Sequence, residues 1–515
     1  MLGDFKRYYR AMRLKAVDGN MNEEEPKAAV PIPTSSAEVK TALESAFNGS
    51  FDFVIKAFEG DIVLMAFIEG LVDKLLISES IVAPITQTVN EFKTGRTKEK
   101  TVRCLKPKLA SLCNMVEITD FNECVNAILS GCTVIFVDGD QTALNIGLRK
   151  FEKRSISEPL SETVSRGSRE GFTEDIQINM TLIRRMIKDG KLVFELLTVG
   201  RITKTKVSIC YLKGLANQEI IDETRKRLKN IKTEAILESG YIEEYISDAP
   251  LSIFPTVFNS ERPESVAGKL LEGRVAILCD GTPNVLTVPN LFVDYLQYAE
   301  DYNNRWAFSI IIRAVRFFAF ALSTMAPAYY IAILCFHQDV IPFKLLVTLA
   351  SSMEGVPFSP IIEMLVLTAL FEIIKESGLR ISRAMGQAVS IVGGLIIGQA
   401  AVQAGLFSAP AVVIIGATSL SAFIISKLDA PVMIIRISMM IAANILGILG
   451  ITLLTTGFLA YMCSLKSFGV PYLSPITPLC GKDMKDSFIR IPIWAVFERP
   501  ETITRRYGEN DTRSK

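Results

Sequence analysis

The chain has 515 residues, of which 49% are hydrophobic and 22% are charged, and its formal net charge is +1. With so little net charge, the protein has no overall positive field that would favour nucleic acid. A single His and nine Cys without a CxxC pair give no recognisable metal site. These averages combine a charged front (residues 1–304), an apolar stretch (305–465) and a basic tail (466–515).

Residues 1–38 are polar and contain prolines, and we expect them to form a disordered arm. The opening MLGDFKRYYR lacks the apolar stretch of a secretory signal, so we expect the front of the chain to stay in the cytoplasm. From residue 39 onward, apolar runs alternate with helical patterns, which predicts an α/β region.

A repeated pattern divides this region. Residues 132–139 (CTVIFVDG) and 274–281 (RVAILCDG) are both apolar strands that end in Asp-Gly, and each precedes a second strand. Two separate β-hairpins would explain the pattern. We favour two related subdomains, residues 39–150 and 151–304, with Asp138 and Asp280 at equivalent places.

The second subdomain has two further signals. A β-ribbon is predicted for residues 191–199 and 203–212, and an amphipathic surface helix for residues 217–237.

Between the two copies lies the loop EPLSETVSRGSREGF, residues 158–172. Its residues Arg166, Gly167, Arg169 and Gly171 suit either an anion cradle at a helix start or an interface loop. The sequence has no GxxxxGK[ST] phosphate loop, and we therefore favour the interface.

The run 384–426 contains no Asp, Glu, Lys or Arg and is long enough for two membrane spans. A further span is predicted at 317–336, with Arg313 and Arg316 at its cytoplasmic end, and others at 357–374 and 437–465. The prediction is an all-α domain, residues 305–465, of about five spans, with 343–357 as a possible re-entrant segment. Five spans would place the basic tail outside, and an even count would place it inside.

Glu363 and Glu372 are the acids within the body of an apolar segment. Ionisable groups in hydrocarbon usually face protein, water or an ion path, so Glu363 is our candidate for a pore lining or an interface. Val366, Leu367 and Leu370 share its face by the helical period.

Other residues of this stretch have predicted mechanical roles. Pro327 would kink the first span, and Gly355 and Pro357 interrupt the chain, so these three are candidate hinges. Gly394 and Gly398 form a GxxxG pair that favours close helix packing.

Six stretches, in order from residue 158 to 475, resemble the A subunits of the spore germinant receptors of endospore-forming bacteria. They are EPLSETVSRGSREGFTEDIQIN (158–179), CDGTPNVLTVPNLFVDYLQYAEDYNNRW (279–306), FHQDVIP (336–342), EGVPFSPIIEMLVLTALFEIIKESG (354–378), GQAVSIVGGLIIGQAAVQAG (386–405) and SFGVPYLSP (467–475). The usual family sequence near residue 168 is RGPREGF, and this chain has Ser168 in place of the proline.

The resemblance implies a membrane subunit with a cytoplasmic N-terminal domain of two α/β parts. It also implies a transporter-like B subunit and a lipoprotein C subunit as partners, and homo-oligomers that form a nutrient-gated cation channel in the inner spore membrane. A secondary transporter and a non-conducting scaffold or signal-transducing subunit are the alternatives. We expect neither a cofactor nor enzymatic activity, because the sequence shows no nucleophile–base pair, metal spacing or phosphate loop.

Overall fold

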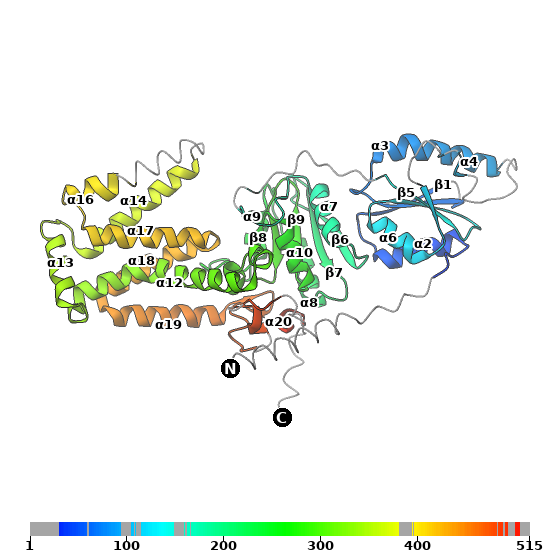
Figure 1. The fold of residues 1–515 in the computed structure, drawn as a ribbon. Coiled ribbons are helices and arrows are strands. Elements are labelled where there is room, and N and C mark those ends of the chain that lie inside the picture. Colours follow the sequence, from blue (N-terminus) through cyan, green and yellow to red (C-terminus); the bar gives the residue numbers. More distant parts are fainter. Residues whose placement is uncertain are drawn as a thin grey trace, which may run out of the picture.

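The computed structural model describes residues 30–93, 105–148, 162–380, 394–480 and 483–504, together with Pro159. Short stretches inside these ranges (59–60, 108, 110–114, 165, 395, 488–489 and 493–499) are not described. Figure 1 shows three parts in a row: a helical bundle, then an α/β unit formed by residues 162–296, then an α/β unit formed by residues 30–148. We call these parts the bundle, the second unit and the first unit.

The first unit is an antiparallel five-stranded sheet between two layers of helices. Its elements are α2 (Ser36–Phe47), β1 (Phe53–Phe58), β2 (Val63–Ile68), α3 (Lys74–Ile77), η1 (Ser78–Val82), α4 (Ala83–Lys93), β3 (Met115–Ile118), α6 (Phe121–Leu129), β4 (Thr133–Val137) and β5 (Ala143–Ile146). The strand order is β1-β2-β4-β5-β3. Apolar residues of α2 and α6 pack on one face of the sheet, and those of α3, η1 and α4 pack on the other.

The second unit repeats this plan. Its elements are α7 (Ile176–Met186), β6 (Leu192–Val199), β7 (Thr205–Leu212), α8 (Gln218–Asn230), α9 (Ser239–Ile246), β8 (Phe258–Ser260), α10 (Pro263–Leu271), β9 (Val275–Cys279) and β10 (Val285–Val288). The strand order β6-β7-β9-β10-β8 corresponds strand by strand to that of the first unit. Helices α7 and α10 cover one face, and α8 and α9 the other. The chain therefore contains two related subdomains, and each Asp-Gly copy lies in the hairpin of its own unit.

The two repeated aspartates are equivalent in space as well as in sequence. Asp138 Oδ1 accepts the backbone N–H of Ser36 at 3.0 Å, and Asp280 Oδ1 accepts that of Ile176 at 3.2 Å. Each bond satisfies a free amide in the first turn of the helix that opens its unit. The glycine that follows each aspartate has a positive φ, +91° in Gly139 and +89° in Gly281, which glycine adopts at little cost. The Asp-Gly pair thus builds both the hairpin turn and the start of a helix.

The two units meet through a buried ion pair. Arg184 of α7 is fully buried, and its guanidinium lies 2.8 Å from the carboxylate of Asp52, just before β1. Beside it, the N–H of Phe51 donates to the carbonyl oxygen of Phe194 in β6 at 2.9 Å. Edge strands β1 and β6 are therefore tied at one point.

Two sequence expectations for these units have different outcomes. The ribbon predicted at 191–199 and 203–212 is present as the β6–β7 hairpin. The helix predicted at 217–237 was too long, because α8 ends at Asn230. Beyond it, the chain turns to pair with the β6–β7 turn, where Arg201 N–H donates to the carbonyl oxygen of Thr233 at 3.0 Å.

The disordered-arm prediction falls partly outside the described residues, which begin at residue 30. Within residues 30–38, Ile32 is buried and Pro31 bridges to Asp120, so this stretch packs on the first unit. The predicted boundary between the two subdomains, at residue 150, also lies outside the described residues.

The bundle follows the second unit. Its elements are α12 (Trp306–Phe336), η3 (Gln338–Val340), α13 (Phe343–Met353), α14 (Pro360–Arg380), η4 (Ile396–Ala400), α16 (Ala401–Gln403), α17 (Ala409–Ile424), η5 (Ser426–Leu428), α18 (Asp429–Leu446) and α19 (Ile448–Ser464). Among the described residues, two helices are long and apolar enough to cross a membrane, 306–336 and 426–446, and three shorter apolar helices accompany them. Helix α12 lies at the centre, against α17, α18 and α19.

The single span predicted for residues 437–465 is wrong. The chain breaks at Gly447, where φ is +61°, and α19 turns back along α18. Figure 1 shows α19 returning beside α12 to the second unit. The tail therefore lies on the same side of the bundle as the α/β units. The turn at Gly447, which the sequence pattern does not reveal, brings it there.

The tail forms a C-terminal segment, residues 466–504, that packs on the second unit. Its elements are β11 (Lys466–Ser467), β12 (Val470–Pro471), η6 (Asp483–Asp486) and α20 (Glu501–Thr504). Phe468, Val470 and Ile503 enter the core of the second unit. The N–H of Phe292 also donates to the carbonyl oxygen of Tyr472 at 2.9 Å.

Candidate functional site

The candidate site is the junction between the second unit and the bundle. It contains η2 (Phe292–Leu296), α11 (Glu300–Asn303), the first turns of α12 and the C-terminal segment. At its centre, Asp301 is 2% exposed, and its Oδ2 accepts from Arg313 Nε at 3.2 Å and from Arg316 Nη1 at 2.7 Å. The guanidinium of Arg313 also lies 3.1 Å from the carboxylate of Asp486.

Other bonds extend this network to the C-terminal segment. The hydroxyl of Tyr302 donates to Asp486 Oδ2 at 2.6 Å. The guanidinium of Arg490 donates to the backbone carbonyl oxygens of Asn304 and Tyr302 at 3.0 and 3.1 Å. We call Asp301, Arg313, Arg316, Asp486 and Arg490 the junction cluster. Removing one partner of a buried ion pair usually costs about 3–5 kcal/mol, because the other charge is then left buried and unpaired, so each member of the cluster depends on the others.

The sequence placed Arg313 and Arg316 at the cytoplasmic end of a predicted span, and the structure adds that each has a partner within the chain. Both are buried and paired within the chain. The signal in the sequence was a charge in a long apolar run, since such a charge normally needs a protein partner. What the sequence did not show is the partner, Asp301, which lies in the short helix α11 just before α12.

A second buried group lies beside the cluster. Asp294 accepts the N–H of Leu291 at 2.7 Å and pairs with Arg274 at 2.8 Å and with Lys269 at 3.3 Å. Burial alone would raise the pKa of Asp294, but the Arg274 and Lys269 charges outweigh it and hold the pKa at about 2. Burial lowers the pKa of Lys269 to about 8, and the charge of Arg274 acts in the same direction. Asp294 and Lys269 therefore both stay mainly charged at neutral pH.

The loop predicted as an interface lies at this junction. Glu162 forms an ion pair with Lys427, in the connection between α17 and α18. Its Oε2 accepts from Ser260 Oγ at 2.7 Å. The ammonium of Lys427 also lies 4.0 Å from the ring centroid of Phe258, as does that of Lys269. The loop therefore touches both the second unit and the bundle.

The four predicted loop residues lie in different environments. Arg166 and Arg169 have exposed side chains, and Gly171 is buried. Gly167 has φ +145°, and a Cβ there would lie 2.7 Å from Asn303 Nδ2, so a side chain would collide with α11. The anion-cradle alternative is not supported, because Asp175 already accepts the first free amides of α7, from Gln177 and Ile178 at 2.6 and 3.2 Å.

Glu363, the candidate pore residue, lies at the opposite end of the bundle and is fully buried. Its Oε1 accepts the backbone N–H of Ser408, at the start of α17, where the helix dipole favours a negative charge. The hydroxyls of Ser408 and Tyr330 are 3.4 Å apart, which adds α12 to the contact. Glu363 Oε2 has no hydrogen-bond partner among the described residues.

The predicted face-mates of Glu363 are not equivalent. Leu367 is buried with it, Leu370 is half-buried, and Val366 is 37% exposed on the outside of α14. Within one copy, Glu363 and Leu367 therefore face protein, while Val366 faces outward. Whether any of them lines a pore stays a prediction.

Arg436 of α18 is a further buried charge in the bundle and is 2% exposed. Its Nε donates to the carbonyl oxygen of Ser323 in α12 at 2.8 Å, and its Nη1 lies 3.8 Å from Glu372 of α14. Glu372 also lies 3.4 Å from Lys375. Contacts of Arg436 therefore link α12, α14 and α18 inside the bundle.

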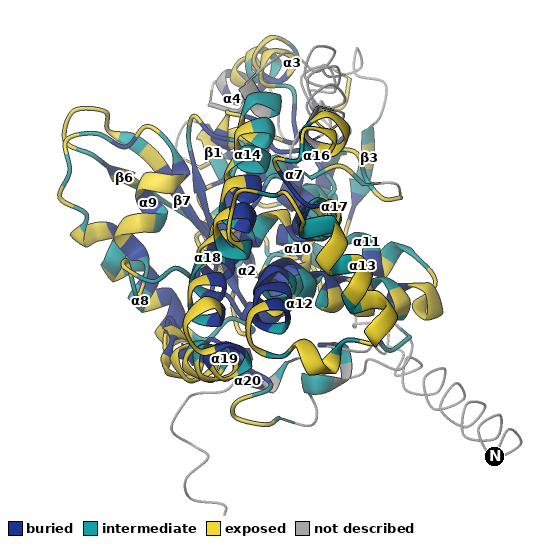
Figure 2. Cartoon of the chain, turned by 90° about the vertical axis from the view of Figure 1, so that its left-hand side faces the viewer, coloured by how far each residue is buried: buried dark blue, intermediate teal, exposed yellow. Residues whose placement is uncertain are grey.

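The remaining predicted residues occupy turns and open faces. Pro327 is buried inside α12, and Gly355, with φ +91°, lies with Pro357 in the turn between α13 and α14. Gly394 and Gly398 are exposed, and nothing lies within 4 Å of a Cβ placed on either. Their predicted helix packing is thus not found within the described part of the chain. Helix α13, at the far end of the bundle, is largely exposed (Figure 2).

Among the described residues, no group of three or more His, Cys, Asp or Glu side chains lies close enough to hold a metal ion. At this junction, buried ion pairs connect the second unit and the C-terminal segment to the apolar helices of the bundle.

Comparison with known proteins shows which proteins the chain is similar to. The model of the Bacillus/Clostridium GerA spore germination protein matches residues 41–502. Spore germination protein KA of Bacillus subtilis is 38% identical over 490 residues, which cover 94% of this chain and 89% of that protein. Spore germination protein GerLA of Bacillus cereus is 37% identical over 439 residues, covering 85% and 88%.

Two further matches complete the comparison. The uncharacterized membrane protein YfkQ of Bacillus subtilis is 38% identical over 488 residues, covering 93% of each chain. A crystal structure of the N-terminal domain of the A subunit of the Bacillus megaterium spore germinant receptor GerK3 is 32% identical. It covers 52% of this chain and 99% of that one, with a TM-score of 0.41.

Proposed function

The chain belongs to the GerA family of spore germination proteins, and from this we propose that it is the A subunit of a nutrient-responsive germinant receptor. In this proposal the bundle lies in the inner spore membrane and the two α/β units lie in the cytoplasm. A transporter-like B subunit and a lipoprotein C subunit complete the receptor. Copies of the chain assemble into a channel that conducts cations when the nutrient binds.

The length and direction of the helices support the membrane placement. At 1.5 Å per residue, α12 is about 46 Å long, which exceeds a hydrocarbon layer of roughly 30 Å. Helices α18 and α19 form an antiparallel pair, and the C-terminal segment returns to the second unit. These contacts support an even number of passes, with both the α/β units and the tail in the cytoplasm. The exposed Arg305 and Lys466 at that end agree with the excess of basic residues on cytoplasmic sides.

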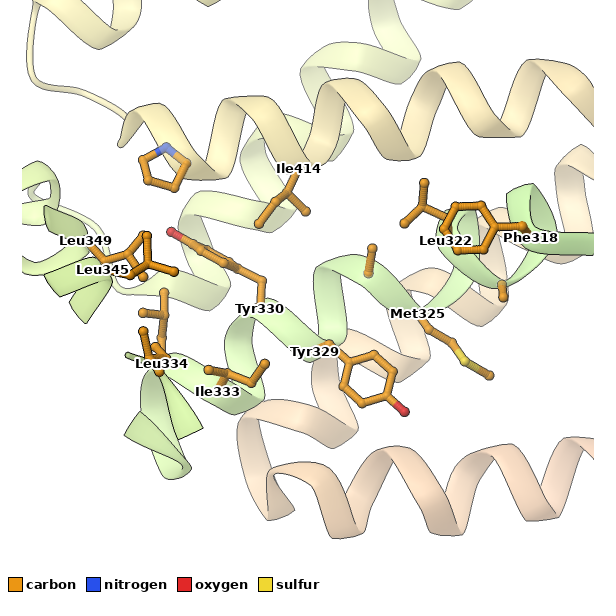
Figure 3. A pocket seen from close by; sticks show the side chains of 14 residues that line it. Phe318, Leu322, Met325, Tyr329, Tyr330, Ile333, Leu334, Leu345, Leu349 and Ile414 are labelled. Atoms are coloured by element: carbon orange, nitrogen blue, oxygen red, sulfur yellow. The ribbon is translucent and has the colours of Figure 1, made fainter. Parts of the chain in front are cut away.

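The apolar interior of one copy supports a path that forms between copies. Glu363 and Arg436 are buried among helices and engaged in contacts within the chain. A groove of about 590 Å³ between α12, α13 and α17 is lined by apolar and tyrosine side chains, which suit lipid or protein better than a hydrated ion (Figure 3). An ion path would thus require assembly.

The observation that carries the proposal is the junction cluster. It ties the first helix of the bundle, the C-terminal segment and the second unit at one buried point. A rearrangement of the second unit would therefore move α12 directly. In energetic terms, the nutrient opens the channel only if the receptor binds it more tightly in the open state than in the closed state.

The test uses spores that carry this chain as their only A subunit, together with its own B and C subunits. After nutrient addition, we expect release of monovalent cations before any other germination event, and none from spores that lack the chain. If the chain is present in the inner spore membrane and no cations are released, the proposal is wrong. If germination requires the chain but reconstituted receptor carries no current, the chain is a non-conducting signal-transducing subunit instead.

A further inference from the structure

Helix α12 lacks one of its own backbone hydrogen bonds, and a side chain of α18 replaces it. Pro327 has no N–H, so the carbonyl oxygen of Ser323, four residues earlier, receives no bond from within the helix. Arg436 Nε donates to this oxygen at 2.8 Å. Ser323 and Pro327 are buried and Arg436 is 2% exposed, so water has little access to the oxygen. We call this contact the hinge bond.

A further weakness lies in the turn before Pro327. The hydroxyls of Ser323 and Thr324 both donate to the carbonyl oxygen of Phe320, at 3.0 and 2.8 Å. Such bonds from a side chain to the backbone compete with the helical bond and often bend a helix. A proline is the commonest cause of a sharp kink. Residues 320–327 are therefore the part of α12 where a bend costs least, and the hinge bond holds this part straight.

The guanidinium that makes the hinge bond also faces α14. Arg436 Nη1 lies 3.8 Å from the carboxylate of Glu372, which is too far for a hydrogen bond. Glu372 lies 3.4 Å from Lys375, which in turn pairs with Asp429. Arg436 thus holds α12 by a short bond and α14 by a loose ion pair. A shift that brought Glu372 closer would compete with the Ser323 carbonyl for the guanidinium.

The half of α12 beyond Pro327 has room to move. The groove of about 590 Å³ between α12, α13 and α17 runs along it. Figure 3 shows Tyr330 and Leu334 of α12 projecting toward Leu345 and Leu349 of α13 in this groove. The space between these helices is not filled within the described part of the chain. A bend at Pro327 would therefore displace few packed side chains.

The hinge bond also lies between the junction cluster and the far end of the bundle. Arg316, which pairs with Asp301, precedes Ser323 by seven residues, or about 10 Å along the helix. While the hinge bond is present, α12 moves as one rod from the second unit to the far end of the bundle. Without it, the two halves of α12 move separately.

We propose that Arg436 positions α12 for gating: the hinge bond keeps the helix in its resting form, and its release lets the half beyond Pro327 bend when the nutrient binds. The inference rests on the proposed channel function. Arg436 acts here through the backbone of α12 and has no contact with an ion. This role differs from ordinary packing, because Arg436 is needed only while residue 327 lacks an N–H.

The first test is a double-mutant cycle in the full-length chain, measured as the melting temperature in detergent. Arg436→Met removes the donor and keeps a long side chain, and it should lower the melting temperature by about 2–4 °C. Pro327→Ala gives Ser323 a backbone donor, so Arg436→Met should cost much less in that background. The loss of the Glu372 contact is common to both backgrounds and cancels. Equal costs in the two backgrounds would overturn the proposal.

The second test separates gating from stability, by measuring cation release from spores over a range of nutrient concentrations. Arg436→Met frees the hinge, so half-maximal release should need roughly tenfold less nutrient, which corresponds to the loss of one buried hydrogen bond. Pro327→Ala removes the hinge, so it should need more nutrient, and the double variant should behave like Pro327→Ala. A residue that only stabilises the bundle would not shift the two single variants in opposite directions. No shift, or shifts in the same direction, would overturn the proposal.

Pro410→Ala is the matched control for the proline. Pro410 lies in the first turn of α17, where the helix needs no N–H from it, so its replacement should change neither quantity. If the unmodified chain releases cations and the variants show no opposite shifts, only the hinge is wrong. If the unmodified chain releases none, the channel function is wrong and the gating role of Arg436 falls with it. The double-mutant cycle then still shows whether Arg436 replaces the missing backbone bond.

Discussion

Glu363 shows how one side chain can hold three helices in place. Its carboxylate accepts the N–H of Ser408 in a fully buried site, and the Ser408 hydroxyl approaches Tyr330. Glu363→Ala should lower the free energy of unfolding by about 1–3 kcal/mol, because a buried amide loses its acceptor. Glu363→Gln should lose less, since its amide oxygen can still accept that bond. Thermal unfolding in detergent measures both.

Val366→Ala is the matched control on the same helix, since Val366 is partly exposed and its truncation leaves no buried polar group. If it destabilises the chain as much as Glu363→Ala, the anchoring role is wrong. Cation flux through the same variants tests the pore role separately: unchanged flux in a folded Glu363→Ala protein would remove Glu363 from the conduction path.

Glu243, on α9 of the second unit, makes stability depend on pH. Burial raises its pKa from 4.5 to about 7, and the charge of Glu238 adds to the effect. The folded state therefore holds this proton more tightly than the unfolded chain. The group's contribution to stability is complete below pH 4.5 and is lost as the pH rises from there through about 7.

Glu243→Gln stays neutral at every pH, so it should raise the melting temperature relative to the unmodified chain at pH 8 and hardly at pH 4.5. The gain in unfolding free energy has an upper limit of about 3 kcal/mol. Melting curves at both values measure it. Glu244→Gln, at the exposed neighbouring position, is the control. A gain that does not depend on pH would contradict the assignment.

At the scale of elements, the break between α18 and α19 decides which side of the bundle the tail reaches. Gly447 has φ +61°, and a Cβ there would lie 3.1 Å from Phe336 and 3.2 Å from His337. Gly447→Ala should therefore destabilise the hairpin by about 1–2 kcal/mol, from the left-handed backbone and the contact together. Gly457→Ala is the control, because Gly457 lies inside α19 with nothing within 4 Å of a Cβ. It should gain up to about 1 kcal/mol in helix propensity.

The same break shows what a single sequence can predict. Gly447, Gly450 and Gly457 lie in one uncharged run, and hydropathy does not distinguish the glycine that turns from those that stay helical. The difference lies in tertiary contacts with the end of α12, which periodicity does not contain. The Asp-Gly turns were predictable because they act locally: the glycine supplies the positive φ that a tight hairpin turn needs. The bond from each aspartate to the start of a helix was not predictable, since those helices begin 102 and 104 residues earlier in the chain. Within the junction cluster, the contacts of Asp486 and Arg490 were not predictable, since their partners lie 173 and 186 residues away in the chain. Asp301 lies only 12 residues before Arg313, but no periodic pattern in the sequence indicates that the two side chains meet.

For the whole molecule, the junction cluster is the charged contact that joins the second unit, the first helix of the bundle and the C-terminal segment. The bundle's first helix leaves the second unit there, and the chain returns there after α19. The first unit is attached farther away, through Arg184 and Asp52. A movement of the first unit thus reaches α12 through the second unit, which contacts the bundle at the junction cluster, at the Glu162–Lys427 ion pair and through shared apolar residues such as Phe292 and Phe320.

Asp301→Asn tests this coupling, because it keeps the shape of the side chain and removes the charge that Arg313 and Arg316 share. Leaving those buried cations without it should cost about 3–5 kcal/mol. We expect a lower melting temperature and weaker nutrient-dependent cation release, with the protein still in the membrane. Asp339→Asn, at an exposed position in η3 at the far end of the bundle, should change neither quantity. Normal release from an Asp301→Asn chain of reduced stability would mean that the cluster holds the parts together without transmitting the signal. Normal release and normal stability together would contradict both roles.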